Sequence, residues 1–261
     1  MRTFNYPQEV IEYILGFLRG NTRTLAQCSL VCRLWRRPSQ RELYRMLVIA
    51  VGNSGSSPCL DDFISFLSSF TADTPQRLIR DLTVCGSQAP AVPSDVSVED
   101  IIKLISYLPA LKSLSLQGFN ILDSSGGFRS GDQYHLERLT FANVDLTFSD
   151  SASFSSFLDA SGATFLFLQS VTSKRTIALD TPSRIRTLRL RSRGLSERYL
   201  GVFSRGPLDK LDIDCISLSD MRALGSFLAS SPQITHLSID ITGAIGRARG
   251  SKCLHGTSCI I

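Results

Sequence analysis

The 261-residue chain has little of what several common classes of protein require. It contains no Asn-x-Ser/Thr acceptor for N-glycosylation, and its seven cysteines are an odd number at wide spacing. This usage favours reduced thiols, in the cytosol or nucleus, over a secreted disulfide framework. No apolar run approaches the roughly 20 residues of a membrane span, and Gln8, Glu9 and Glu12 interrupt the N-terminal segment that a secretory signal would need.

Motifs that carry common enzyme chemistry are also missing. The sequence has no Gly-x-Gly-x-x-Gly, no His-Glu-x-x-His and no Gly-x-Ser-x-Gly, and it contains only three histidines. The glycines of GRARGSK, from Gly246, are too close together for a phosphate-binding loop. We therefore expect no catalytic residue, no cofactor and no metal, and we predict that the chain is not an enzyme.

What is present is the composition of a globular protein. Hydrophobic residues make up 43% of the chain, enough for one large domain or two modest ones. The net charge of +5 is mild, because 23 acidic residues are spread among 28 basic ones. Such a balance does not call for nucleic acid as a partner, and we predict neither a nucleic-acid nor a membrane partner.

Residues 1–46 have the pattern of three short helices. Pro7 and Glu9 suit a first helical turn, and Thr24 with Gln27, then Ser39 with Glu42, have capping-box spacing for a second and a third helix. In the first helix the apolar residues follow helical spacing at Val10, Ile11, Ile14, Leu15, Phe17 and Leu18. A core of this size gives only marginal stability alone, so we expect contacts with a partner or with the next domain to stabilise the module.

Two cysteines four residues apart, Cys28 and Cys32, lie on the expected second helix. A structural zinc site needs four ligands, and the nearest further thiol, Cys59, follows a stretch of flexible composition. We expect buried or interface thiols without metal, since free cysteine behaves as a small apolar residue.

The stretch YPQEVIEYILGFLRGNTRTLAQCSLVCRLWRRPSQRELYR resembles an F-box, most closely those of fungal F-box proteins. Tyr6 replaces the usual leucine, and Pro38 falls inside what is often continuous helix. The resemblance covers about forty residues. The matching positions are Pro7, Glu9, Ile14, Leu18, Leu25, Leu30, Val31, Cys32, Arg33 and Trp35.

The resemblance implies a docking function. It predicts that the module binds the Skp-type adaptor of an SCF ubiquitin ligase and, through it, a cullin scaffold. The adaptor contacts that it implies are Pro7, Ile11, Ile14, Leu18, Leu25, Val31 and Trp35. The alternative is that these residues only form the three-helix core, but so many large apolar side chains exceed what a short module can hide.

A repeat organises residues 47–241. Seven copies of apolar-x-x-Leu-x-apolar, the fourth of them weaker, start 22 to 32 residues apart at Ile79, Leu111, Leu136, Ala163, Ile185, Leu208 and Ile234. Helical patterns separate the copies, and LYRMLVI at 43–49, before the first copy, suits a further strand. The spacing predicts an α/β fold, a short leucine-rich-repeat-like solenoid with a parallel sheet and outer helices, followed by an irregular tail over 242–261. A doubly wound α/β sheet with a small-molecule site is the alternative, but no loop carries the glycine pattern of such sites.

Strand alternation predicts which side chains line the open face of the sheet. If the copies are in register, one continuous patch contains Phe165, Phe167, Arg189, Arg191, Asp212 and Asp214. We predict that this patch binds a protein substrate, because arginine with aromatic residues is a common anchor composition. The alternative is that the arginines merely pair with the aspartates of the next strand.

Together these patterns predict a substrate-recruiting adaptor of an SCF-type ubiquitin ligase. The first rival is a leucine-rich-repeat scaffold with no ubiquitin role, whose N-terminal helices only cap the repeats. The second rival is an enzyme on an α/β sheet, which would require a pocket with converging polar groups.

Overall fold

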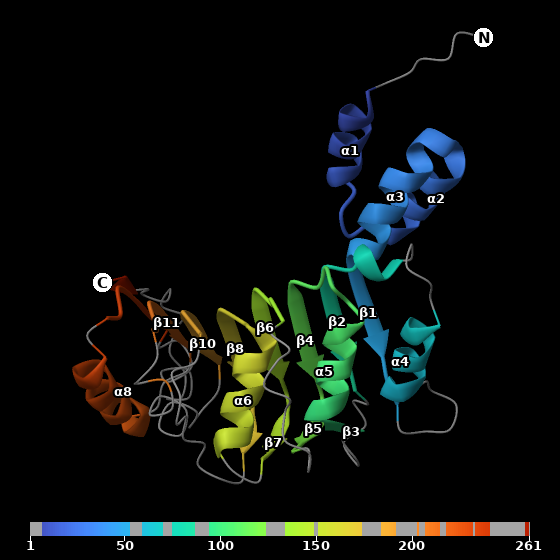
Figure 1. The fold of residues 1–261 in the computed structure, drawn as a ribbon. Helices are drawn as coiled ribbons and strands as arrows, with labels where there is room; N and C mark the ends of the chain where they lie inside the picture. Colours follow the sequence, from blue (N-terminus) through green and yellow to red (C-terminus); the bar gives the residue numbers. More distant parts are fainter. Residues whose placement is uncertain are drawn as a thin grey trace, which may run out of the picture.

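A computed structural model describes residues 7–52, 59–69, 75–86, 94–123, 134–148, 151–173, 184–191, 203, 207–214, 218–231, 233–240 and 259–260. In this part of the chain, an N-terminal group of helices projects from one end of a large sheet that carries helices along one face (Figure 1).

The N-terminal module consists of α1 (Gln8–Gly16), α2 (Thr22–Val31) and α3 (Arg33–Arg45). Two predicted starts were wrong. The cap of α2 is Asn21, whose side chain accepts a hydrogen bond from the Thr24 backbone N–H at 3.1 Å, and α3 begins at Arg33 and continues through Pro38. Proline removes one main-chain donor, but the helix still includes both the buried Pro38 and the buried Ser39.

The core of this module is small. Three residues, Ile11, Leu15 and Leu25, are buried, and Leu18, Cys28, Trp35 and Leu43 pack against them. Because so few side chains hold three helices together, removal of any one of the three removes a large share of the packing.

The sheet has nine strands in the order β1-β2-β4-β6-β8-β10-β11-β12-β13. All neighbours pair in parallel except β13 (Cys259–Ile260), which is antiparallel to β12. The first parallel strand, β1 (Met46–Ala50), overlaps the further strand predicted before the repeat. The other seven overlap the seven predicted copies: β2 (Asp81–Cys85), β4 (Ser113–Gln117), β6 (Arg138–Ala142), β8 (Phe165–Gln169), β10 (Thr187–Arg191), β11 (Lys210–Asp214) and β12 (His236–Asp240).

A second, parallel sheet of four short strands was not predicted. It runs in the order β3 (Ser94–Ser97), β5 (Phe119–Leu122), β7 (Asp145–Thr147) and β9 (Thr172–Ser173). Three of its strands follow strands of the large sheet after one to two residues, so that β4 leads into β5, β6 into β7 and β8 into β9 (Figure 1).

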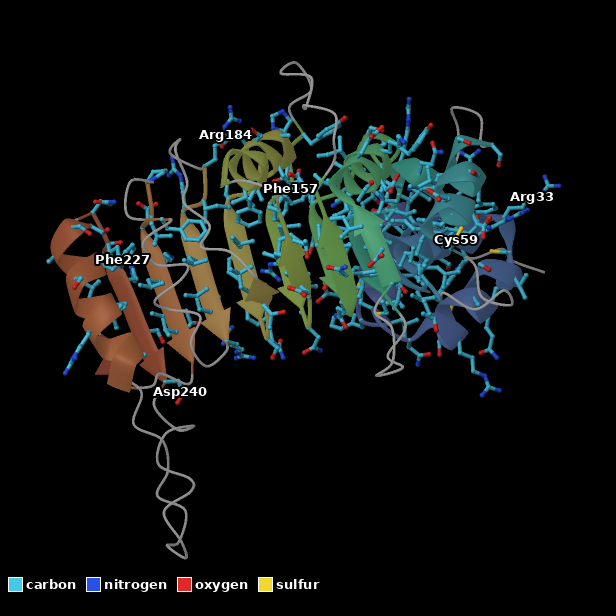
Figure 2. The ribbon with its side chains drawn as sticks, turned by 90° about the horizontal axis from the view of Figure 1, so that it is seen from below. Arg33, Cys59, Phe157, Arg184, Phe227 and Asp240 are labelled. Carbon is cyan, nitrogen blue, oxygen red and sulfur yellow. The ribbon has the colours of Figure 1, made fainter. Side chains whose placement is uncertain are left out.

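Helices cover one face of the large sheet: α4 (Leu60–Ser68), α5 (Val98–Ser106), α6 (Ser151–Ser161) and α8 (Leu218–Ser230), with a short 3-10 turn η1 (Pro75–Arg77) before β2 (Figure 1). The second and fourth residues of β2, β4, β6, β8 and β10 are buried on this side. Phe157 of α6 and Phe227 of α8 lie between their helices and the sheet (Figure 2). This alternation leaves the opposite face of the sheet open to solvent.

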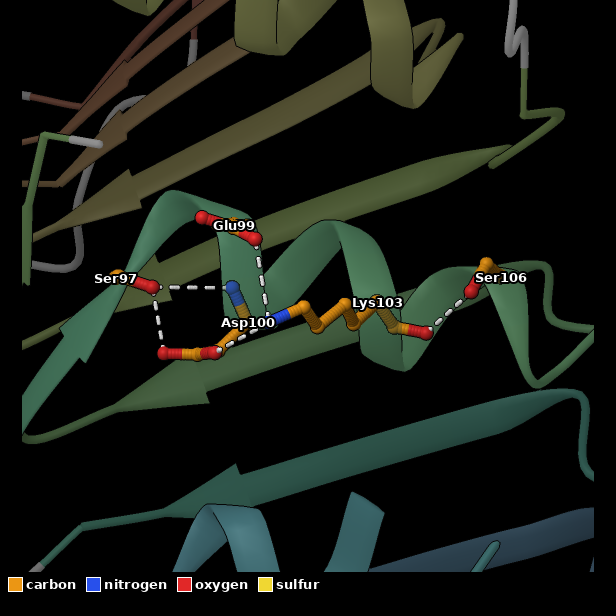
Figure 3. Close-up of polar contacts among 5 residues, drawn as sticks. All are labelled: Ser97, Glu99, Asp100, Lys103 and Ser106. Carbon is orange, nitrogen blue, oxygen red and sulfur yellow. Dashed lines mark hydrogen bonds and ion pairs between the residues drawn. The ribbon is translucent and has the colours of Figure 1, made fainter. Parts of the chain in front are cut away.

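Local polar contacts fix the start of α5 (Figure 3). The Ser97 hydroxyl accepts a hydrogen bond from the Asp100 backbone N–H at 3.1 Å and donates one to its carboxylate at 2.5 Å. One turn later, Lys103 Nζ lies 3.2 Å from Glu99 Oε1. The hydrogen bond and the charge of Glu99 raise the pKa of Lys103. These contacts fit the acidic first turn that the helix dipole favours.

Gly162, which ends α6, cannot be exchanged without strain. Its φ of +66° lies in the left-handed region, and a Cβ there would stand 1.9 Å from the Tyr134 carbonyl oxygen. We expect Gly162→Ala to lower the free energy of unfolding by about 1–3 kcal/mol, which denaturant titration can measure. Gly225→Ala in α8, where a Cβ meets nothing within 4 Å, is the control. An equal effect of both substitutions would contradict this explanation.

Candidate functional site

The helical module exposes more large apolar side chains than it buries. On α1, Tyr13 and Phe17 are 69% and 73% exposed, and their rings stack edge to face at 4.9 Å. At the junction of α2 and α3, Leu30 and Val31 are 85% and 69% exposed. We call the full set the exposed apolar residues of the module: Val10, Tyr13, Ile14, Phe17, Leu30, Val31 and Leu34. Such a concentration on about forty residues is typical of a protein-binding surface.

The seven predicted adaptor contacts divide between this surface and the core. Pro7, Ile14 and Val31 are exposed, and Leu18 and Trp35 are half-buried against the core. Ile11 and Leu25, in contrast, are fully buried between the three helices, so these two belong to the core as the alternative had it. Whether the accessible residues contact an adaptor stays a prediction.

Sequence reasoning missed five members of the surface: Val10, Tyr13, Phe17, Leu30 and Leu34. A signal for the first three was present. Positions 10, 13, 14 and 17 follow the i, i+3, i+4, i+7 spacing of one helix face, and positions 11, 15 and 18 follow the same spacing on the neighbouring face. Both faces are apolar, so periodicity alone could not tell which one packs inward.

The second candidate surface lies on the open face of the sheet, across β8, β10 and β11. The pairing places Arg189 beside Phe167 on one side and beside Asp212 on the other. Phe165 and Phe167 are half-buried and stand outside the helix-covered core, as the predicted register requires. We call this set, with Arg191 and the strand position of Asp214, the sheet patch.

Cation–π contacts organise the sheet patch. The guanidinium groups of Arg189 and Arg191 lie 5.5 and 5.6 Å from the centre of the Phe167 ring. Arg189 Nε also lies 3.1 Å from Asp212 Oδ2, with the two side chains 33% and 30% exposed. The Arg189–Asp212 pair that the alternative proposed therefore exists, and it coexists with the arginine–aromatic stack. At this exposure the ion pair adds little stability.

Arg138 extends the patch by one strand and was not included in it from the sequence. Its guanidinium carbon lies 4.8 Å from the centre of the Phe165 ring. The sequence contained a signal for this contact. Arg138 is the third residue of the copy that starts at Leu136, and Phe165 is the third residue of the next copy, so the two side chains are neighbours on adjacent strands.

Cys28 and Cys32 are free thiols in different surroundings. Cys28 is half-buried and packs against the module core, whereas Cys32 is exposed at the end of α2. The sequence predicted buried or interface thiols, and an interface role for Cys32 stays a prediction. Among the described residues no three His, Cys, Asp or Glu side chains group closely enough to hold a metal ion. In the same part of the chain, no helix has the length and apolarity needed to cross a membrane.

Comparison with known proteins bears on the N-terminal module. No curated protein matches the chain. Residues 6–50, however, match the family model of the F-box-like domain, and this range contains α1, α2, α3 and β1. The three helices and their exposed apolar residues fit that assignment. The chain thus carries an F-box-like domain at residues 6–50, a kind of domain that typically binds Skp-type adaptors.

Proposed function

We propose that this chain recruits protein substrates to an SCF-type ubiquitin ligase, in the cytosol or nucleus. The F-box-like module binds the Skp-type adaptor, which links the chain to a cullin scaffold. The observation that carries the proposal is the set of exposed apolar residues on a module whose sequence matches the F-box-like domain. Burial of these side chains against an adaptor removes a large apolar area from water, which favours association.

In this proposal the repeat region binds the protein substrate. Parallel strands that recur every 22 to 32 residues from β2 to β12, with helices on one face, support a leucine-rich-repeat-like domain. The sheet patch then lies on the face without helices, where such domains present binding surfaces. Arginine stacked on phenylalanine offers both an apolar anchor and a planar set of donors to a partner. In this role the chain itself performs no catalysis.

Direct binding tests the proposal. The purified full chain should form a stoichiometric complex with a Skp-type adaptor from its host, and the adaptor should bridge it to a cullin in size-exclusion chromatography. A chain that does not associate with the adaptor at micromolar concentration would instead support the rival, a repeat scaffold with no ubiquitin role.

The sheet patch yields a separate prediction. We expect Phe167→Ala and Arg189→Glu each to weaken substrate capture by about tenfold or more, because the first removes the ring that both arginines contact and the second reverses a central charge. Quantitative co-purification from host cells, normalised to the amount of adaptor recovered, measures the effect. Adaptor recovery itself should not change, since the patch lies on β8, β10 and β11, outside the F-box-like domain.

Arg186→Glu is the matched control for the charge reversal. Arg186 lies 3.9 Å from Asp209, so the control also breaks an exposed ion pair between neighbouring repeats, but outside the sheet patch. Equal loss of substrate with Arg186→Glu and Arg189→Glu would show that general charge, and not the patch, governs capture.

A further inference from the structure

A polar cleft lies where the helical module meets the beginning of the sheet. It has a volume of about 940 Å³ and is lined by α1, α3, η1 and the residues that lead into β2. Six arginines surround it: Arg19, Arg37, Arg41, Arg45, Arg77 and Arg80. They come from segments far apart in the sequence, which the junction of α3 with β1 and β2 brings together (Figure 1).

The cleft carries an excess of positive charge. Its two carboxylates, Glu12 and Glu42, leave four of the six arginine charges without compensation. Glu42 lies 2.9 Å from Arg19 and 3.8 Å from Arg45, and Glu12 lies 3.8 Å from Arg41. Among the described residues, no carboxylate pairs with Arg37, Arg77 or Arg80, although Arg80 is half-buried.

The arrangement on α3 concentrates positive charge, only part of which Glu12 and Glu42 compensate. Arg37, Arg41 and Arg45 follow one another at i, i+4 and i+8, so they form a single stripe of like charge that lines the cleft together with residues of η1 and of the segment that leads into β2. Like charges at this spacing destabilise a helix. An anion bound between the stripe and the arginines at positions 77 and 80 removes that repulsion and supplies acceptors for several guanidinium donors.

We propose that this cleft binds a small anion that carries two or more phosphate groups. Guanidinium groups bind phosphate oxygens in a planar, bidentate geometry, and arginine is preferred over lysine where such recognition matters. One phosphate would fill little of 940 Å³ and could not reach arginines on both walls. The volume lies in the range of small-molecule sites, but the charged lining selects an anion in place of an apolar ligand.

The cleft does not overlap the proposed adaptor-binding surface. Gln8 and Glu12 of α1 line the cleft, whereas Val10, Ile14 and Phe17 are exposed on the other side of the same helix. The two sites can therefore be occupied together, and the anion site does not depend on the adaptor role. A ligand held by α3 and by residues 77 and 80 would tie the helical module to the first strands of the sheet.

Calorimetric titration of the full chain with tripolyphosphate, at constant ionic strength, tests the proposal. We expect one site per chain, with tripolyphosphate binding at least about tenfold more tightly than orthophosphate or sulfate. The double substitution Arg37→Gln and Arg77→Gln should weaken this binding by about tenfold or more, because it removes one donor from each wall. Neither arginine forms an ion pair with the cleft carboxylates, so circular dichroism should show an unchanged fold.

The matched control is Arg33→Gln with Arg36→Gln, which removes the same total charge, here from α3 alone and outside the cleft lining. This control should retain binding within about twofold. Equal loss with both pairs, equal affinity for sulfate, or no saturable binding by the unaltered chain would each overturn the proposal. Tighter binding of a single-stranded oligonucleotide, lost with the same cleft substitutions, would also overturn it in favour of a nucleic-acid site.

Discussion

Replacement of Ile14 and Val31 by aspartate is expected to abolish binding of the Skp-type adaptor and to leave the fold intact. Both side chains are exposed in the free chain, so the carboxylates remain hydrated until the adaptor covers them. A buried, unpaired carboxylate at each position then opposes association, and we expect affinity to fall at least about a hundredfold. Biolayer interferometry with purified adaptor measures the loss.

Tyr107→Asp provides a control for this double substitution. Tyr107 is an exposed aromatic residue at the end of α5, outside the F-box-like domain, and its replacement introduces one carboxylate where the double substitution introduces two. It should bind the adaptor as the unaltered chain does. Undiminished affinity in the Ile14→Asp and Val31→Asp double variant would remove the exposed apolar residues from the proposed interface.

Leu25→Ala is expected to unfold the helical module selectively. Leu25 is 1% exposed and is one of three buried residues in that core, so its truncation should cost about 2–5 kcal/mol. Hydrogen exchange followed by mass spectrometry should show loss of protection in α1, α2 and α3, with β4 and β6 still protected. Adaptor binding should disappear together with the structure of the module.

Leu30→Ala separates packing from binding on the same helix. Leu30 is 85% exposed, so its truncation should change stability by less than about 0.5 kcal/mol but should still weaken adaptor binding. If Leu25→Ala and Leu30→Ala proved equally stable, the buried core between the helices would not hold the module together as described.

The repeated strands could be predicted from the sequence because one pattern defines both position and orientation. In six of the seven copies the leucine at the fourth place is buried, and in the last copy Leu237 is half-buried. The neighbours at the third and fifth places face outward, even in the weak copy at Ala163. A parallel ladder with constant register then places Phe167 between Thr140 and Arg189 without further information.

Other features depend on tertiary contacts that no local pattern contains. The strands β7 and β9 have three and two residues, too few for a periodic signal, and only their neighbours define them as a sheet. The second apolar face of α1 is exposed because Ile11 and Leu15 already meet α2 and α3. The arginines of the cleft lie up to sixty residues apart, so only the folded chain reveals their convergence.

The chain passes from α3 to β1 with no residue between them: Arg45 ends the helix and Met46 begins the strand. The Arg45 carbonyl accepts a hydrogen bond from the Arg80 backbone N–H at 2.9 Å, and Met46 is already in register with Asp81. No hinge therefore exists at this point, because rotation of α3 would pull β1 away from β2. The junction therefore fixes the angle between α3 and β1. Each repeat added or removed along the sheet would shift its far end by about one strand spacing, roughly 4.8 Å, and leave the direction of the helical module unchanged.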